Sequence, residues 1–307
     1  MKINKIKTKR LTWIHINHPD KESMEYLREN YDFHPLDLED CLTKIQRPQI
    51  SEYAHYLFFI LTFPVYNRQT KEIESSEVDF FIGSKYLVTV SDGGVDVVDR
   101  FFNEIKTDEY TREKFTLSPF ATDLLYEILH RLQNYTFPML DHVSHDIESI
   151  EKRIFSGEHR ELVREILYIK RNIVDFRRIM QAHKNIVKKL MSTHNNFFMH
   201  DKMNIYFSNI LDRTKDIWDI LETQKENINA FQETHESLIS FRLNDIMKTL
   251  TIISVIIIPA NLIASLFGMN TIITPIVQDE RGFYEILSII LITILGFLFY
   301  FRSKKWL

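Results

Sequence analysis

The sequence predicts an α/β N-terminal cytoplasmic domain, followed by a long helical stalk and two C-terminal transmembrane helices. Three observations lead to this fold class. Short β-rich runs alternate with helical patterns up to residue 118. Helix-period spacing then dominates, and glycine is nearly absent, with Gly157 alone until Gly268. Near the C-terminal end lies a long segment without any charge.

Composition excludes several classes of protein. Hydrophobic residues make up 45% of the 307 residues and charged residues 26%, which excludes a wholly disordered or low-complexity chain. The single cysteine, Cys41, cannot form an internal disulfide, so a disulfide-stapled secreted scaffold is excluded. The net charge of -4 does not point to nucleic acid as a partner. We find no phosphate-binding glycine loop and expect no organic cofactor.

The N-terminal α/β domain is expected to span residues 1–118. Strands are predicted at Tyr56–Phe63, Val78–Ile82 and Tyr86–Val90, because these β-rich runs are bounded by turn residues. Helical patterns lie at Ser23–Glu29 and Val95–Ile105. A cleavable secretion signal is not expected, because no sustained apolar stretch follows the basic opening residues.

A helical hairpin is predicted over residues 119–200 and a stalk helix over 201–248. In the hairpin, one helix is expected over 119–155, started by Ser118-Pro119, and a second over 158–191, with a turn at Ser156-Gly157. The next helix begins near Asp201 and meets no breaker before Pro259. It is therefore predicted to continue into the membrane as one helix of about 65 residues, on the order of 100 Å long.

A coiled-coil-like seam is predicted on the stalk helix, because apolar residues recur at alternating spacings of four and three. These residues are Ile210, Ile217, Leu221, Ile228, Phe231 and Leu238, with polar Thr214, Gln224 and His235 at the remaining seam positions. The seam could pack against helices of the same chain or against other copies. Polar seam residues can set oligomer number, so self-association is the more attractive interpretation.

Two membrane crossings are predicted, at residues 249–270 and 283–301, joined by an extracytoplasmic loop at 271–282. No charged residue or histidine occurs from Thr249 to Gln278, and about 20 such residues cross a hydrocarbon layer of roughly 30 Å. Basic residues precede the first crossing and recur in the tail, 302–307. This distribution predicts a multi-pass protein of the cell (inner) membrane with both termini in the cytoplasm.

The first crossing carries a polar stripe. At about 100° per residue its hydrogen-bonding side chains fall within an arc of roughly 80°; they are Thr251, Ser254, Asn261 and Ser265. Such a stripe faces another helix or an aqueous path. Apolar and polar side chains alternate where the same face extends along the helix, at Asn244, Met247, Leu250 and Ile258. Two helices cannot enclose a pore, so an aqueous path would require several copies around an axis.

At the outer end of this crossing stands Gly268-Met269-Asn270. With this tripeptide, two C-terminal membrane helices and a basic tail at Arg302–Leu307, the chain resembles the CorA family of magnesium and cobalt transport proteins. The resemblance covers nearly the whole chain and extends to three further regions: His34–Asp40 with Gln46-Arg47-Pro48-Gln49 and Tyr53, Lys170-Arg171 through Arg177-Arg178, and Asn244–Ile253.

The resemblance implies a CorA-like homopentamer, not an enzyme, in which membrane potential drives uptake of magnesium, and of cobalt as a further candidate. Magnesium would be both the transported ion and a regulatory ligand, with the lipid bilayer as the other partner. Asn270 would form an outer amide ring that meets the hydrated ion, with Gly268 and Met269 shaping the turn. The pore-lining candidates are Asn244, Met247, Leu250, Ser254, Ile258 and Asn261.

Intracellular magnesium is expected to gate the protein. The resemblance places one regulatory position at Asn209, where the family has an acid, so Asp212, one turn on, and Asp92 are the other candidates. The outer loop also departs from the family, because Thr274-Pro275-Ile276-Val277 stands where Met-Pro-Glu-Leu is common. Asp279 and Glu280 lie close by and could attract cations by long-range charge.

Two alternatives stay open. The protein could transport zinc or another divalent metal, as members of the superfamily with a changed tripeptide do, although the intact Gly268-Met269-Asn270 favours magnesium. It could also be a membrane-anchored sensor or scaffold that carries no flux. A membrane-anchored hydrolase would need a clustered catalytic set in residues 1–118, and the sequence offers none that we recognise.

Overall fold

The computed structural model describes residues 3–8, 10–43, 46–116, 120–154, 159–193, 203–269 and 281–306. The chain forms two compact units, Met1–Gln232 and Glu233–Leu307. The first unit contains a sheet and most of the helices, and the second contains the two long apolar segments.

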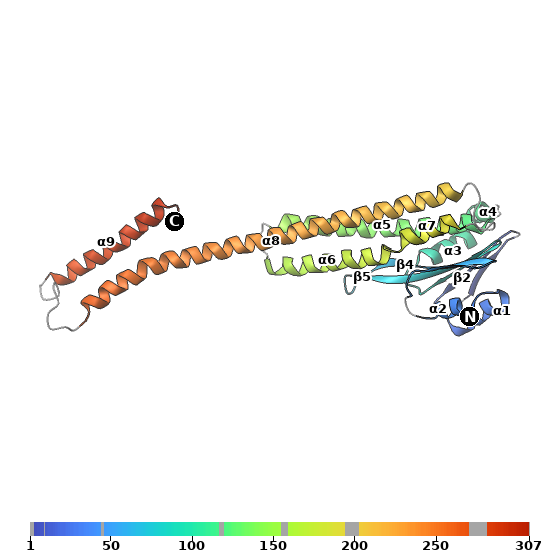
Figure 1. The fold of residues 1–307 in the computed structure, drawn as a ribbon, viewed down its shortest axis with the longest axis horizontal. Coiled ribbons are helices and arrows are strands. Elements are labelled where there is room, and N and C mark those ends of the chain that lie inside the picture. Colours follow the sequence, from blue (N-terminus) through green and yellow to red (C-terminus); the bar gives the residue numbers. More distant parts are fainter. Residues whose placement is uncertain are drawn as a thin grey trace. The chain divides into compact units, whose positions relative to one another are not determined.

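The described residues of the first unit contain one six-stranded sheet in the order β1-β2-β6-β5-β4-β3 (Figure 1). Strands β2 and β6 run parallel, and the other neighbouring pairs are antiparallel. The three predicted strands lie inside β4, β5 and β6, whereas β1 to β3 were not expected. The bounds are β1 Ile3–Lys7, β2 Thr12–Asn17, β3 Ile50–Glu52, β4 Tyr56–Asn67, β5 Glu72–Gly83 and β6 Tyr86–Ser91.

Helices cover both faces of the sheet, as Figure 1 shows. One face meets α1 (Lys21–Asn30) and α2 (Pro35–Asp40), and the other meets α3 (Val97–Thr107), α5 (Ala121–Arg153) and α7 (His183–Ser192). Side chains along β4 therefore alternate between two cores: Leu57, Phe59 and Leu61 enter the larger one, and Phe58 and Ile60 the smaller. This double burial explains why β4 reads as a continuous apolar run.

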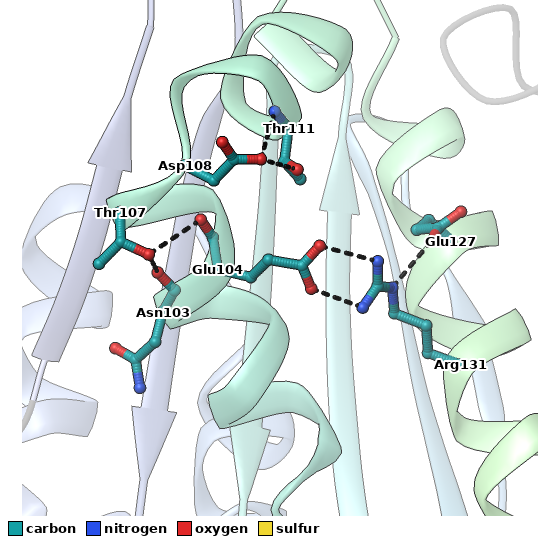
Figure 2. Close-up of polar contacts among 7 residues, drawn as sticks. All are labelled: Asn103, Glu104, Thr107, Asp108, Thr111, Glu127 and Arg131. Carbon is teal, nitrogen blue, oxygen red and sulfur yellow. Dashed lines mark hydrogen bonds and ion pairs between the residues drawn. The ribbon is translucent and has the colours of Figure 1, made fainter.

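An arginine joins α3 to α5 (Figure 2). Arg131 on α5 donates to both carboxylate oxygens of Glu104, over 2.7 and 3.3 Å, and its Nε donates to Glu127 over 2.8 Å. Its guanidinium also lies 4.0 Å from the centre of the Phe101 ring.

Beyond the end of α3, Asp108 accepts a bond from the Thr111 amide at 3.0 Å and so caps α4 (Glu109–Thr116).

Replacing Arg131 by lysine should lower the free energy of unfolding by about 1 kcal/mol, because an ammonium cannot reproduce the paired bonds or the stacking on Phe101. The arginine side chain is 32% exposed, so solvent screening keeps the effect small. The thermal unfolding midpoint of Arg131→Lys would show it. Arg100→Lys is the control, since the Arg100–Asp96 pair is 66% and 65% exposed and its loss should change little.

The predicted helix over 158–191 is two helices, so that prediction was wrong. Helix α6 (His159–Met180) ends, and α7 begins three residues later, at His183. The buried His183 ring donates from Nε2 to the Thr62 carbonyl on β4 at 2.7 Å, while the Thr62 hydroxyl reaches the Ile179 carbonyl at 3.4 Å. Strand β4 thus holds the chain on both sides of the break. Burial lowers the pKa of His183 to about 4.

Helix α8 (Met203–Phe267) is a single helix of 65 residues, as predicted. Within the first unit, its apolar seam residues Ile210, Ile217, Leu221 and Ile228 are buried in the chain's own cores, beside side chains of α5 and α6. The preference for self-association along this part of the seam was therefore wrong. Residue spacing defines the apolar face of a helix but not the partner that covers it.

Two of the polar seam residues, Thr214 and Gln224, bind α5. The Gln133 side-chain amide of α5 donates to the Ile210 carbonyl at 3.0 Å and to the Thr214 hydroxyl at 2.8 Å. The Gln224 amide of α8 donates to the Leu140 carbonyl at 2.8 Å and to the Ser144 hydroxyl at 2.9 Å. Two amide crosslinks, at Gln133 and Gln224, thus connect the helices in opposite directions.

Candidate functional site

Among the residues that the structure describes, two segments are long and apolar enough to cross a membrane, and both lie in the second unit: the C-terminal part of α8, and α9 (Gly282–Ser303). Only 6% of the most apolar window of each helix is buried within the chain. The apolar side chains of these segments therefore face outward, which is the pattern of helices whose surroundings are lipid or other protein copies.

The predicted pore-lining residues all lie on α8. Met247, Leu250 and Ile258 are 53%, 56% and 65% exposed, and Asn244 and Asn261 are also exposed. Helical spacing places them on one face, with the half-buried Ser254 among them. Because its own chain leaves this face open, the face is available to other copies around an axis.

Two backbone features modify this face. The Thr251 hydroxyl donates to the Met247 carbonyl at 2.7 Å, so its polarity is satisfied within the helix. Pro259 lies inside the helix and has no amide hydrogen, which leaves the Val255 carbonyl without its usual helical donor. A membrane helix tolerates such a carbonyl where protein or water replaces the donor.

The end of α8 lies next to the predicted tripeptide. Gly268 follows the helix, and its amide donates to the Ala264 carbonyl at 2.9 Å. A methyl group at this glycine would lie 3.1 Å from that same carbonyl, so the position favours the smallest side chain. Met269 is 57% exposed. Asn270, Asp279 and Glu280 lie outside the described residues.

The basic tail folds back on the end of α9. The Lys304 amide donates to the Tyr300 carbonyl at 3.1 Å, and the Trp306 amide to the Phe301 carbonyl at 2.9 Å. The Trp306 ring stacks on Phe301 with centroids 5.8 Å apart. An indole among lysines at the end of an apolar helix is typical of a membrane–water interface.

The three regulatory candidates differ in how many hydrogen bonds their side-chain oxygens already accept. The Asp92 carboxylate accepts bonds from the Ser76 hydroxyl and from the amides of Glu77 and Gly94, each amide at 3.0 Å. Asn209 and Asp212 lie on the exposed surface of α8, where the Tyr126 hydroxyl of α5 donates to Asn209 Oδ1 at 3.5 Å. Across the described ranges, no hydrogen bond or ion pair joins Asp92 to either of them. A shared site would therefore need another copy or a bound ion between them.

Sequence reasoning missed two buried acids beside Asp92. Glu77 and Asp79 are 6% and 2% exposed and line a cavity of about 360 Å³ that Cys41 and Asp92 also line. Burial, reinforced by the neighbouring Glu77 carboxylate, raises the pKa of Asp79 well above its usual range. A signal was present in the sequence, because Asp79 lies inside the otherwise apolar run Val78–Ile82 and Glu77 directly precedes it.

Comparisons with known proteins agree with this architecture. Residues 8–305 match the family model described as CorA-like Mg2+ transporter protein. The chain is 27% identical over 302 residues to the putative metal ion transporter YfjQ of Bacillus subtilis, covering 96% of this chain and 89% of the relative. It is 26% identical over 297 residues to the cobalt/magnesium transport protein CorA of Thermotoga maritima, covering 96% and 83%.

A solved structure shows the same fold. The complete structure of the CorA magnesium transporter from Methanocaldococcus jannaschii matches with a TM-score of 0.86 at 21% identity, covering 99% of this chain and 94% of that one. The likeness includes the sheet domain, the long helix and the two apolar C-terminal helices. The family match together with the two apolar helices indicates a membrane protein. Because the family model spans nearly its whole length, the chain belongs to the CorA-like Mg²⁺ transporter family, a family of ion transporters and not of enzymes.

Proposed function

We propose that this protein is a homopentameric channel for divalent cations that takes up magnesium, and cobalt as a second substrate, across the inner membrane. In this proposal both termini lie in the cytoplasm, and the basic residues at the membrane ends support that orientation. The observation that carries the proposal is the exposed face of α8, on which amides alternate with apolar side chains within an apolar helix. Copies arranged around an axis turn each of its residues into a ring.

Magnesium chemistry suits neutral amides at the entrance. Magnesium demands octahedral geometry and loses its waters reluctantly, so a site that strips it completely is costly. Carbonyl oxygens of Asn270 would accept hydrogen bonds from those waters and hold the ion weakly enough for conduction. Inward movement of a divalent ion down 100 mV releases about 4.6 kcal/mol, so no nucleotide is needed. Asp279 and Glu280 would add attraction at longer range.

The apolar rings would form the gate. Met247, Leu250 and Ile258 resist a hydrated cation until the helices rotate or separate. Cytoplasmic magnesium bound between subunits holds this constriction shut. Of the regulatory candidates, the exposed Asp212 and Asn209 are better placed to meet another subunit than Asp92, whose carboxylate already accepts three hydrogen bonds.

Ion uptake into proteoliposomes tests the function. Under an inside-negative potential, vesicles with the protein should take up magnesium faster than empty vesicles. Parallel measurements with cobalt, nickel and zinc rank the cations; zinc uptake without magnesium uptake would support zinc transport, which the family model and the cobalt/magnesium relative favour less. Absence of any uptake would leave the sensor or scaffold and reject the channel.

Asn270→Ala should lower magnesium uptake by roughly fivefold, because the entrance loses its ring of amide acceptors, and a net loss of about 1 kcal/mol in the interaction with the hydrated ion corresponds to that factor. The same proteoliposome assay measures this change. Asn204→Ala is the matched control, because Asn204 is an exposed asparagine of α8 in the first unit. Equal uptake by the wild type and Asn270→Ala would reject the assignment of the entrance but leave the channel intact.

A further inference from the structure

An acidic groove lies between α5 and α8 in the first unit. It has a volume of about 400 Å³. Glu148 and Glu151 line it from α5, and Asp219 lines it from α8. Its other polar lining residues include Ser144, Gln224 and Asn227, and no lysine, arginine or histidine lines it. The groove therefore gathers three carboxylates with no cationic side chain among them.

One histidine contacts a groove carboxylate from outside the groove. His145 Nδ1 lies 3.7 Å from Glu148 Oε2, but the histidine side chain is 77% exposed. The imidazole therefore lies mostly in solvent and does not line the groove. Carboxylates gathered on one concave surface concentrate cations from solution.

A buried amide oxygen supplies a second, independent observation. Gln224 is 3% exposed, and its Nε2 must face the Leu140 carbonyl and the Ser144 hydroxyl because a carbonyl oxygen can only accept. The orientation of the amide is thus fixed, and Oε1 is the remaining acceptor. No donor in the described residues reaches this Oε1. A buried acceptor without a donor is costly, and a water held by a cation would satisfy it.

The spacing of the acids decides how a cation would be held. Among the described residues, no three His, Cys, Asp or Glu side chains lie close enough to bind a bare metal ion. A hydrated ion does not need side chains this close together, because its bound waters span the distance to the carboxylates. Magnesium keeps its waters more readily than calcium does. Six waters at roughly 30 Å³ each amount to about 180 Å³, which fits within the groove.

We propose that the groove between α5 and α8 binds a hydrated divalent cation, magnesium in the cell, with Glu148, Glu151 and Asp219 as outer-sphere acceptors and Gln224 Oε1 accepting from one of its waters. The site lies within a single subunit, apart from the pore-lining face and from the residues proposed to sense magnesium. It goes beyond the proposed transport function and does not depend on it. Its effect is to tie α8 to α5 more firmly when magnesium is abundant.

Hydrogen exchange on the full-length protein in detergent tests this site. Magnesium alone should slow exchange in peptides covering residues 144–151 and 219–231. Hexaamminecobalt(III), which cannot exchange its ammonia ligands, should do the same, because it presents N–H groups where hydrated magnesium presents water. The double variant Glu148→Gln/Asp219→Asn should lose the protection with either ion, since the neutral amides keep size but remove charge.

The matched control is Asp141→Asn/Glu226→Gln, which removes one exposed acid from each of the same two helices outside the groove. This control should keep the protection. No protection in the wild type, or protection retained in the groove variant, would overturn the site. Protection by magnesium and not by hexaamminecobalt(III) would overturn outer-sphere binding. None of these readouts measures flux, so they stand apart from the test of transport.

Discussion

Ile258→Asn should raise magnesium uptake at high internal magnesium by at least roughly tenfold, which corresponds to about 1.4 kcal/mol of barrier. Ile258 is 65% exposed on the face that we assign to the pore. An isoleucine ring resists a hydrated cation because it offers the waters of the ion no hydrogen bonds. The asparagine side chain is polar, and its amide oxygen can accept hydrogen bonds from the waters of the ion. Proteoliposomes loaded with high or low magnesium would measure the change.

Ile256→Asn provides the matched control for this experiment. It makes the same substitution two residues away, which places it about 200° around the helix. Ile256 is half-buried and lies away from the proposed pore face. Uptake by Ile256→Asn should remain suppressed at high internal magnesium. If both variants conduct equally, the increase comes from a polar group in the membrane helix, and the proposed face does not line the path.

His183 should make the protein lose stability as the pH falls below neutrality. Burial holds the pKa of the folded ring at about 4, against 6.5 for an ordinary histidine. Between these values the unfolded chain binds a proton that the folded chain does not, so the free energy of unfolding falls with decreasing pH. The full shift corresponds to roughly 3 kcal/mol, complete once the pH reaches the folded pKa. Thermal unfolding midpoints between about pH 7 and about pH 4.5 would record the loss.

His183→Gln isolates this contribution from that of other titrating groups. Glutamine does not titrate, and its amide can still donate to the Thr62 carbonyl that accepts from His183 Nε2. The variant is expected to be less stable near neutral pH but to show a flatter pH dependence. Parallel curves for the wild type and the variant would contradict the assignment, because carboxylates elsewhere would then carry the whole effect.

The membrane segments and the long helix could be predicted because their signals are local. The absence of charge from Thr249 to Gln278 and the absence of a breaker between Asp201 and Pro259 can be read directly along the chain. That the pore candidates share one face of the helix also follows from spacing alone. Which copies or lipids meet that face is not a property of spacing, so pore lining stays a proposal.

Features set by distant contacts could not be predicted in the same way. The break between α6 and α7 contains Gln181-Ala182, neither of which interrupts a helix by itself. At the break, His183 instead bonds to Thr62, a residue 121 positions earlier. Gln224 likewise appeared as a seam residue, and only its partners on α5 show that it binds within the chain. The contact between the buried His15 and the half-buried Asp99, 3.0 Å long, joins residues separated by 84 positions.

The two amide crosslinks between α5 and α8 restrict how these helices can move. The side-chain amides of Gln133 and Gln224 each donate to a backbone carbonyl and to a hydroxyl of the opposite helix. Axial sliding by one helical turn, about 5.4 Å, would leave both buried amides without their hydrogen-bond partners. The two crosslinks therefore oppose axial sliding of α5 against α8. Conformational changes that keep both crosslinks are those in which the two helices tilt or bend together.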